Sequence, residues 1–315
     1  MSVKASLVIP VLNEEKILWR NTETIIEYLD EALNDYEIIL VENGSRDNTE
    51  KIAAELSSQY MKVRTFSIHE PCLGEALKTG VSNAEYEKIV YYPIDLSVNL
   101  DFIDSSIKLL DSNDIVIGSK RLQDARDHRP QTRQIASKGY HQAVKLLFKT
   151  NLTDTTCVKA YRRDIAITLM NQIPTRSNVF ETEVLLEAQR RKHRIAQIPV
   201  IVDDPRRGRL PLRYKVVSKG QDLASLRIDV FSLSMGVMLF LVGSLWLGYL
   251  SLEKLVYNRE GFLNPYSFLI SMMLILFGVQ GITYGLFARL FLQLRHEITV
   301  NNSHKAGNVF KEEAK

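Results

Sequence analysis

The sequence is poor in the residues that build disulfide frameworks and metal clusters. Its 315 residues include only two cysteines, Cys72 and Cys157, and six scattered histidines. Two cysteines exclude a disulfide scaffold and the paired spacing of a structural zinc site, and they suit a reducing compartment. The net charge of only +3 at pH 7 gives no argument for nucleic-acid binding. Residues 1–16 hold only a short, strand-like apolar stretch, so we expect no signal peptide there.

Charge is also missing from two long apolar runs, at residues 230–252 and 265–288. As helices rising about 1.5 Å per residue, each covers roughly 35 Å, enough to cross a hydrocarbon core of about 30 Å. A pair of buried core helices is the alternative, but two consecutive uncharged runs of this length are rare in soluble domains. The sequence therefore predicts two transmembrane helices, and glycines within both could allow close packing in one chain or in a homo-oligomer.

Basic residues predict the orientation of this hairpin. The approach to the first run is rich in them, at Arg206, Arg207, Arg209, Arg213, Lys215, Lys219 and Arg227. In the loop 253–264, by contrast, two basic residues are offset by two acidic ones. We expect a multi-pass protein of the cell membrane, with the soluble part, both chain ends and a tail at 289–315 in the cytoplasm.

Residues 211–229 mix apolar side chains at loosely helical spacing with basic ones. Anionic headgroups attract Lys and Arg beside a membrane by about 1 kcal/mol each. We interpret the segment as an amphipathic helix lying on the cytoplasmic leaflet. An ordinary linker with solvated charges is the alternative.

The remaining segment, 1–210, alternates short β-rich runs with helical stretches. Strands are expected at 6–11, 37–41, 63–68, 88–92 and 114–118, with helices between them. This alternation predicts an α/β domain with a mostly parallel sheet, in which ligands bind beyond the carboxyl ends of the strands.

Polar residues follow each expected strand. They are Asn13, Glu14 and Glu15, then residues 42–47, then His69, Glu70 and Gly74, then Asp95 and Ser97, and finally Ser119, Lys120 and Arg121. Any one group could simply cap a helix or solvate a loop. Five in succession at one edge of a sheet predict a crevice for a nucleotide.

Several of these stretches resemble the motifs of a known family. VIPVLNEE at 8–15, VENGSRDNT at 41–49 and CLGEALKTG at 72–80 resemble the inverting, nucleotide-sugar-dependent glycosyltransferases of family 2, which have the GT-A (Rossmann-like) fold. Further along come GSK at 118–120, RQIASK at 133–138, DTTCVKAYRR at 154–163, FETE at 180–183 and PRRGR at 205–209. In this order they are similar to the dolichyl- and polyprenyl-phosphate sugar synthases.

The resemblance implies a divalent cation, Mg²⁺ or Mn²⁺, held by Asp95 with help from Ser97. Relatives usually carry two aspartates here, whereas this chain reads PIDLS at 93–97, with Pro93 in place of the first. A magnesium ion often keeps several waters and needs only one or two carboxylates beside the substrate phosphates. Asp95 alone could therefore suffice; otherwise it only caps the turn after its strand.

The resemblance also assigns roles to other residues. The nucleotide sugar is expected to contact Pro10, Leu12, Glu14, Glu42, Gly74 and Asp95. The acceptor phosphate is expected to contact Lys120, Arg133, Ser137, Arg206 and Arg207. Asp95, Lys120 and Arg133 are the expected catalytic residues, whereas Glu181 and Glu183 either approach the sugar or cap a helix.

The function that follows is inverting transfer of a hexose from a nucleoside diphosphate sugar to a polyprenyl or dolichyl phosphate on the cytoplasmic face. GDP-mannose is the favoured donor. One alternative is transfer of glucose from UDP-glucose to undecaprenyl phosphate, and another is a catalytically impaired membrane scaffold of the same fold. A processive polysaccharide synthase is disfavoured, because neither Trp19 nor Trp246 follows an arginine as the Q-x-x-R-W motif requires.

Overall fold

The computed structural model describes residues 4–204, 212–257 and 265–312. The chain divides into two compact units, Met1–Asp222 and Leu223–Lys315. The sequence-based boundaries at residues 210, 229, 252 and 288 stay predictions, as does the interfacial location of residues 211–229. Arg206 and Arg207 lie outside the described residues.

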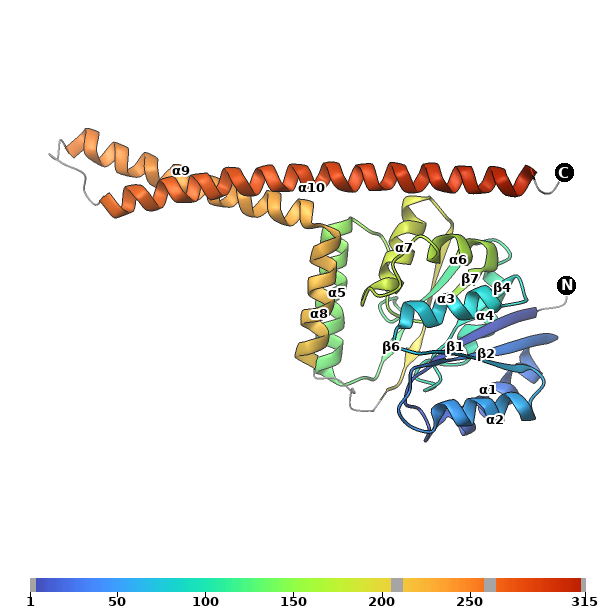
Figure 1. Ribbon diagram of the computed structural model, residues 1–315. Helices are drawn as coiled ribbons and strands as arrows, with labels where there is room; N and C mark the ends of the chain where they lie inside the picture. Colours follow the sequence, from blue (N-terminus) through green and yellow to red (C-terminus); the bar gives the residue numbers. More distant parts are fainter. Residues whose placement is uncertain (1–3, 205–211, 258–264, 313–315) are drawn as a thin grey trace. The chain divides into compact units, whose positions relative to one another are not determined.

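The first unit alternates strands with helices (Figure 1). In chain order they are β1 (Lys4–Val11), α1 (Leu18–Ala32), β2 (Asp35–Asn43), α2 (Thr49–Gln59), β3 (Val63–Ile68), α3 (Leu73–Asn83), β4 (Lys88–Tyr91), α4 (Asp101–Leu109), β5 (Ile115–Ser119), β6 (Arg126–Asp127), α5 (Gln131–Phe148), β7 (Lys159–Arg162), α6 (Arg163–Met170), α7 (Phe180–Arg190), β8 (Ile195–Pro199) and β9 (Ile201–Val202). The helix α8 (Leu212–Leu226) runs across the boundary between the two units.

The main sheet has the strand order β3-β2-β1-β4-β7-β5-β8. Its strands pair in parallel except β7, which runs antiparallel to both β4 and β5. The expected mostly parallel α/β sheet is therefore confirmed. The short strands β6 and β9 pair separately.

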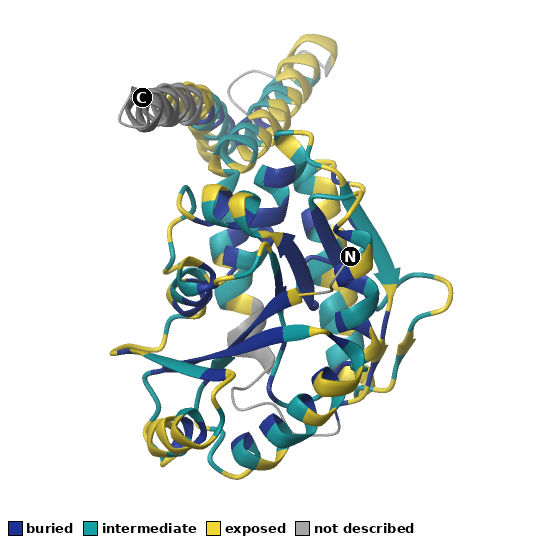
Figure 2. Cartoon of the chain, turned by 90° about the vertical axis from the view of Figure 1, so that its right-hand side faces the viewer, coloured by how far each residue is buried: buried dark blue, intermediate teal, exposed yellow. Residues whose placement is uncertain are grey.

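Helices cover both faces of this sheet because successive side chains of a strand point to opposite sides. Leu7 and Ile9 of β1 belong to a buried cluster that includes residues of α1, α2 and α4, whereas Val8 belongs to a second cluster that includes residues of α3, α6 and α7. Strands buried on both faces read as near-continuous apolar runs, as β1 and β2 do. Their burial is visible in Figure 2.

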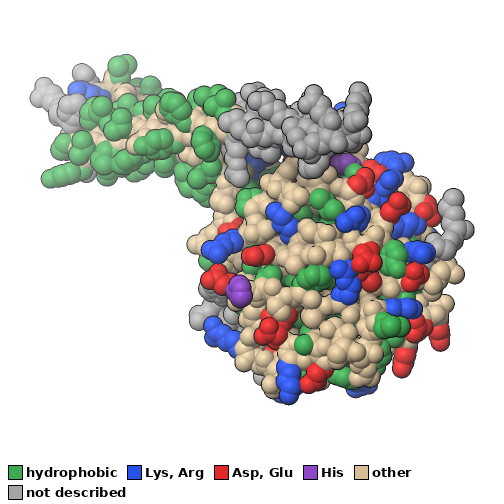
Figure 3. Space-filling model, turned by 45° about the vertical axis from the view of Figure 1, so that its right-hand side comes forward, with side chains coloured by type: hydrophobic (Ala, Val, Ile, Leu, Met, Phe, Trp, Pro, Cys, Tyr) green, Lys and Arg blue, Asp and Glu red, His purple; other side chains and the backbone are tan. Residues whose placement is uncertain are grey.

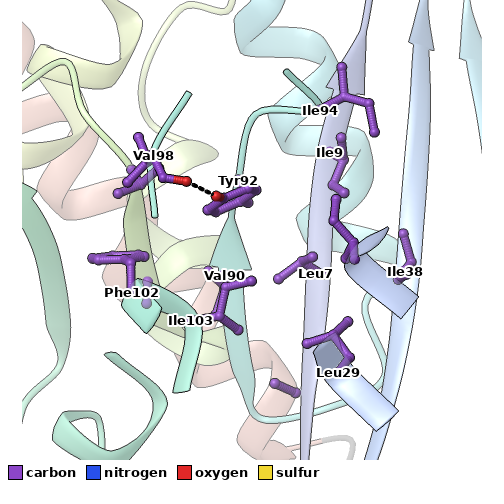
Figure 4. Close-up of a cluster of buried hydrophobic side chains, with 14 of the residues drawn as sticks. Leu7, Ile9, Leu29, Ile38, Val90, Tyr92, Ile94, Val98, Phe102 and Ile103 are labelled. Atoms are coloured by element: carbon purple, nitrogen blue, oxygen red, sulfur yellow. Dashed lines mark hydrogen bonds between the residues drawn. The ribbon is translucent and has the colours of Figure 1, made fainter. Parts of the chain in front are cut away.

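The α1–α4 side of the core is drawn in Figure 4. Leu29 of α1 lies near Leu7 there, whereas Phe102 and Ile103 of α4 lie beside Val90 of β4. The buried Tyr92, just after β4, donates its hydroxyl hydrogen bond to the carbonyl oxygen of Val98. This bond closes the loop of residues 93–97, so the core fixes the position of the segment that carries Asp95.

Beyond the end of α8, the second unit contains α9 (Ile228–Tyr257) and α10 (Pro265–Glu312). Two stretches, Ile228–Val256 and Pro265–Phe291, are long and apolar enough to cross a membrane. Their large apolar side chains are mostly exposed, and hydrophobic residues cover the visible face of this hairpin (Figure 3). A soluble core helix would bury such residues, so the exposure favours contact with lipid.

Glycines let the two helices approach closely. A side chain on Gly236 would come within 2.4 Å of the backbone nitrogen of Ile282, and one on Gly278 within 2.5 Å of that of Phe240. Ser232 also donates a hydrogen bond of 2.9 Å to the carbonyl oxygen of Gly281. Small residues at such crossings are typical of membrane helix pairs. Because these contacts lie within one chain, the glycines give no separate support to a homo-oligomer.

Candidate active site

The loops that follow β1 and β2 are joined by hydrogen bonds. The backbone N–H of Arg46 donates to Asn13 Oδ1 at 2.7 Å, and the N–H of Asn13 donates to Ser45 Oγ at 3.0 Å. The N–H of Glu14 donates to Thr49 Oγ1 at 2.8 Å. Asn13 has a positive φ of 50°, which asparagine tolerates better than most residues. The two motifs thus form one structured edge beside the sheet.

Glu42 lies at this edge, where the parallel register places it beside Val11. Its side chain is buried, and Oε1 accepts a hydrogen bond of 2.5 Å from the backbone N–H of Ser45. One carboxylate oxygen therefore holds the following turn. The expected nucleotide contacts Pro10, Leu12 and Glu14, all half-buried, lie on the same edge.

Gly74 has a packing role at the start of α3. A side chain there would come within 2.3 Å of the Thr175 carbonyl oxygen and within 2.9 Å of the Phe180 ring. Residues on either side of Gly74 and residues of the segment before α7 line a cavity of about 400 Å³. Its lining includes Cys72, Thr175, Asn178, Phe180, Glu181 and Lys219.

Asp95 lies in the turn after β4. Its Oδ1 accepts a hydrogen bond of 3.0 Å from the N–H of Ser97, and the intervening Leu96 has a positive φ of 51°. Such a conformation is uncommon for a bulky residue and is often found at functional sites. Among the described residues no group of three or more His, Cys, Asp or Glu side chains could hold a metal ion. A divalent cation fits here only if substrate phosphates supply part of its oxygen ligands.

Lys120 is held by a buried carboxylate that the sequence analysis did not assign. Its Nζ lies 2.7 Å from Asp154 Oδ2, and Arg121 Nη1 lies 3.0 Å from the same oxygen. The Asp154 side chain is only 1% exposed and that of Lys120 only 5%. Burial by itself raises the pKa of Asp154, but Lys120 and Arg121 outweigh it and lower that pKa to about 2. We call Lys120, Arg121 and Asp154 the buried triad.

Arg133 and Ser137, the other expected acceptor contacts among the described residues, are also engaged within the protein. Arg133 Nη1 lies 2.8 Å from Asp204 Oδ2. Ser137 Oγ accepts a hydrogen bond of 2.8 Å from Arg121 Nη2, which links α5 to the buried triad. The structure thus brings Lys120 and Ser137 together through Arg121.

With this geometry in view, comparison with known proteins decides the family. Residues 6–170 match the family model described as "Glycosyl transferase family 2". The chain belongs to this family. The sequence-based expectation of a family 2 glycosyltransferase is therefore confirmed.

Curated relatives of this family 2 chain include three named sugar transferases. Glycosyltransferase AglD of Haloferax volcanii is 28% identical over 63% of the chain and 33% of its own length. Dolichyl-phosphate beta-glucosyltransferase ALG5D of Trichomonas vaginalis is 29% identical over 63% of the chain and 65% of its own length. The human dolichyl-phosphate beta-glucosyltransferase is 27% identical over 71% of the chain and 74% of its own length. The chain thus spans about a third of the first relative and just under two thirds of the second.

Solved structures agree with the fold expected of family 2. A mycobacterial protein matches with a TM-score of 0.53 at 19% identity, over 71% of this chain and 74% of its own. Glucosyl-3-phosphoglycerate synthase of Mycobacterium tuberculosis, solved with Mn²⁺, UDP and glucosyl-3-phosphoglycerate, matches with a TM-score of 0.52 at 18% identity, over 71% of this chain and 79% of its own. At these identities the likeness concerns the fold alone.

Two buried residues of this family 2 site were missed by sequence reasoning. The motif at residues 154–163 predicts no role for Asp154. Lys159 of β7 is 1% exposed; it pairs with Glu181 and donates to the carbonyl oxygen of Cys157 at 2.6 Å. Its Nζ also lies 5.5 Å from the centre of the Tyr91 ring. The sequence does carry a signal for Lys159, which stands between the apolar residues Val158 and Ala160. A lysine that is buried with such neighbours needs an anionic partner.

Proposed function

We propose that this chain transfers a hexose, with inversion, from a nucleoside diphosphate sugar to a polyprenyl or dolichyl phosphate at a membrane surface. The observation that carries the proposal is the combination of two features in one family 2 chain. A cationic site lies at the carboxyl edge of the sheet, and two apolar helices are long enough to anchor that site to lipid. A lipid-linked anionic acceptor matches both features.

The sugar proposed here is glucose. Sequence motifs alone favoured GDP-mannose as the donor, but relatives that share 27–29% identity with the chain are named dolichyl-phosphate beta-glucosyltransferases. We therefore place UDP-glucose first and keep GDP-mannose as the second donor to be tested.

The acceptor in this reaction needs little activation. A phosphate monoester is already anionic at neutral pH, so no strong general base is required. The protein's contribution is then to position the two substrates and to stabilise the charge that develops on the leaving diphosphate. Lys120, with Ser137 nearby, and Arg133 are the proposed contacts for the acceptor phosphate, because cationic donors form charge-assisted hydrogen bonds with phosphate.

A divalent cation, Mg²⁺ or Mn²⁺, is proposed at Asp95. The Asp95 carboxylate would supply a hard oxygen ligand to such an ion, and Ser97 lies in the same turn. When bound, the ion would neutralise part of the negative charge on the leaving diphosphate. Pro10, Leu12, Glu14 and Glu42 are the proposed surroundings of the nucleoside.

The proposed location is the cytoplasmic face, with both chain ends on that side. The basic residues that precede α9 in the sequence support this orientation. Arg206 and Arg207 are included in the proposal as contacts for the headgroup on the strength of the sequence resemblance alone.

The decisive experiment is to incubate the full chain, in vesicles containing polyprenyl phosphate, with UDP-glucose and GDP-mannose together. The mass of the lipid product then identifies both the sugar and the carrier. We expect a hexosyl phosphate lipid with wild type and a strong loss with Asp95→Ala. Absence of any lipid product would contradict the proposal.

The alternative of an impaired scaffold is favoured by one observation, the proline at position 93. Calorimetry of the nucleotide sugar with and without Mn²⁺ separates the two functions. Binding that depends on the metal supports the transferase, and the absence of such binding supports the scaffold.

A further inference from the structure

Lys219 lies in an unusual position for a lysine of a membrane-proximal helix. It belongs to α8, is half-buried, and lines the cavity of about 400 Å³ together with Cys72 and Glu181. Its Nζ lies 5.3 Å from the centre of the Tyr140 ring on α5. The aromatic ring supports the cation from one side. The ammonium group therefore belongs to the wall of the cavity and does not extend along a solvated surface.

Lys219 also differs from the other cations around the site in its ion pairing. Lys120, Lys159 and Arg133 each pair with a carboxylate. Among the residues whose side chains the structure describes, none forms an ion pair with Lys219. Burial lowers the pKa of the Lys219 amine, and repulsion from Lys159 and Lys120 acts in the same direction, whereas Glu181 opposes it. A cation that is partly removed from water without an ion-pair partner is costly, and an anionic ligand would reduce that cost.

Hydrogen bonds of α8 and of α5 fix the position of Lys219. One turn further along α8, the carboxylate of Asp222 accepts a hydrogen bond of 2.8 Å from the backbone N–H of Asn178, which also lines the cavity. On α5, the hydroxyl of Tyr140 lies 2.8 Å from Thr182 Oγ1 of α7. The amine is thus held by a helix and a ring that are each joined by a hydrogen bond to Asn178 or Thr182 of the first unit. Such preorganisation reduces the entropy that ligand binding would otherwise cost.

We infer that Lys219 is a phosphate-binding residue of the active site, so that α8 completes the site. Its ligand is a substrate phosphate, either the diphosphate of the sugar donor or the monoester headgroup of the lipid acceptor. This inference rests on the proposed function for the identity of the substrates. It adds a residue from the juxtamembrane helix to the expected set, and it links correct placement of that helix to substrate binding.

The test compares Lys219→Met with the matched control Lys51→Met in the full chain in lipid nanodiscs. Lys51 lies on α2, and its side chain is 76% exposed, so its replacement removes the same charge from a solvated surface. Calorimetry measures Kd for UDP and GDP with Mn²⁺ in one arm, and for a short-chain polyprenyl phosphate in the other. We expect Lys219→Met to weaken binding at least tenfold in one arm, while Lys51→Met stays within twofold of wild type. The arm that changes identifies the source of the phosphate.

Two further variants separate charge from packing. Lys219→Arg keeps a cation and should stay within about threefold of wild type, whereas Lys219→Gln keeps most of the length and should behave like Lys219→Met. Hydrogen exchange of α8 peptides checks that the helix remains folded in each variant. Affinities for both ligands equal to those of Lys51→Met, or equal losses in Lys219→Arg and Lys219→Gln, would overturn the inference.

Failure of the proposed function gives a different result. In that case wild type forms no lipid-linked sugar with either donor, yet the binding arms still report whether Lys219 contacts phosphate.

Discussion

Replacement of Asp154 by asparagine should destabilise the first unit, residues 1–222, because it breaks the buried triad. The substitution keeps the shape of the side chain but removes the charge shared by Lys120 and Arg121. Removing one partner of a buried ion pair typically costs about 3–5 kcal/mol, since the remaining charge stays buried without compensation. We therefore expect the free energy of unfolding at pH 7 to fall by about 3 kcal/mol in Asp154→Asn.

The same carboxylate gives a pH dependence with a definite sign. Its pKa is lowered from 3.8 to about 2 in the folded state. Its contribution to stability is therefore fully present above about pH 4 and is lost as the pH falls toward 2. That contribution is about 2 kcal/mol, of which roughly half is lost by pH 3. The stability difference between wild type and Asp154→Asn should shrink accordingly between pH 5 and pH 3.

Urea unfolding of the full chain in nanodiscs, followed by hydrogen exchange in β5 and β7 peptides, measures these changes. The matched control is Asp164→Asn, because the Asp164 side chain is 69% exposed and lies 3.8 Å from Arg162. Exposed pairs are worth about 0–1 kcal/mol, so the control should change stability little. The double variant Lys120→Met/Asp154→Asn should lose less than the sum of the single variants. A loss below about 1 kcal/mol in Asp154→Asn, or strict additivity in the double variant, would refute the reasoning.

Three further predictions concern other parts of the molecule. Asp95→Ala should lower turnover by about 10²-fold and abolish metal-dependent donor binding in calorimetry; unchanged turnover would contradict its proposed role. Gly74→Ala should destabilise the first unit by about 1–3 kcal/mol, measured as a lower thermal midpoint, because the added carbon meets a backbone oxygen at 2.3 Å. Gly139→Ala should not lower the midpoint, because nothing lies within 4 Å of that position. Gly236→Val should separate α9 from α10, which would be measured as a loss of disulfide cross-linking between cysteines introduced into the two helices. Gly248→Val should leave the helix pair intact, since nothing lies within 4 Å of that position.

Much of the fold could be predicted because periodicity and burial agree in the first half of the chain. The strands β1 to β5 each follow from a short apolar run, and buried residues of α1 recur at helical spacing, at Leu18, Thr22, Ile25 and Leu29. The strand β7 was not expected. It has four residues, begins with a lysine and ends with an arginine, and takes its place only through antiparallel pairing with β4 and β5.

The site was predicted less completely than the fold. Motif order located Glu42, at the end of β2, and the loop that carries Asp95, since both directly follow the expected apolar runs. Ion pairing could not be read in the same way, because Asp154 lies 34 residues from Lys120 and Asp204 lies 71 residues from Arg133. Sequence alone gives each of these charges the appearance of a solvated loop residue, and only the folded chain brings the partners together.

This pairing ranks the cations that a substrate phosphate would meet. Arg133 and Asp204 offset one another, and so do Lys159 and Glu181. The buried triad keeps one net positive charge, because two cations share the carboxylate of Asp154, and Lys219 keeps its own. Attraction between charges is stronger where burial lowers the effective dielectric constant. An incoming phosphate should therefore be drawn chiefly to the buried triad and to Lys219, and Arg133 should act more in orienting it than in attracting it.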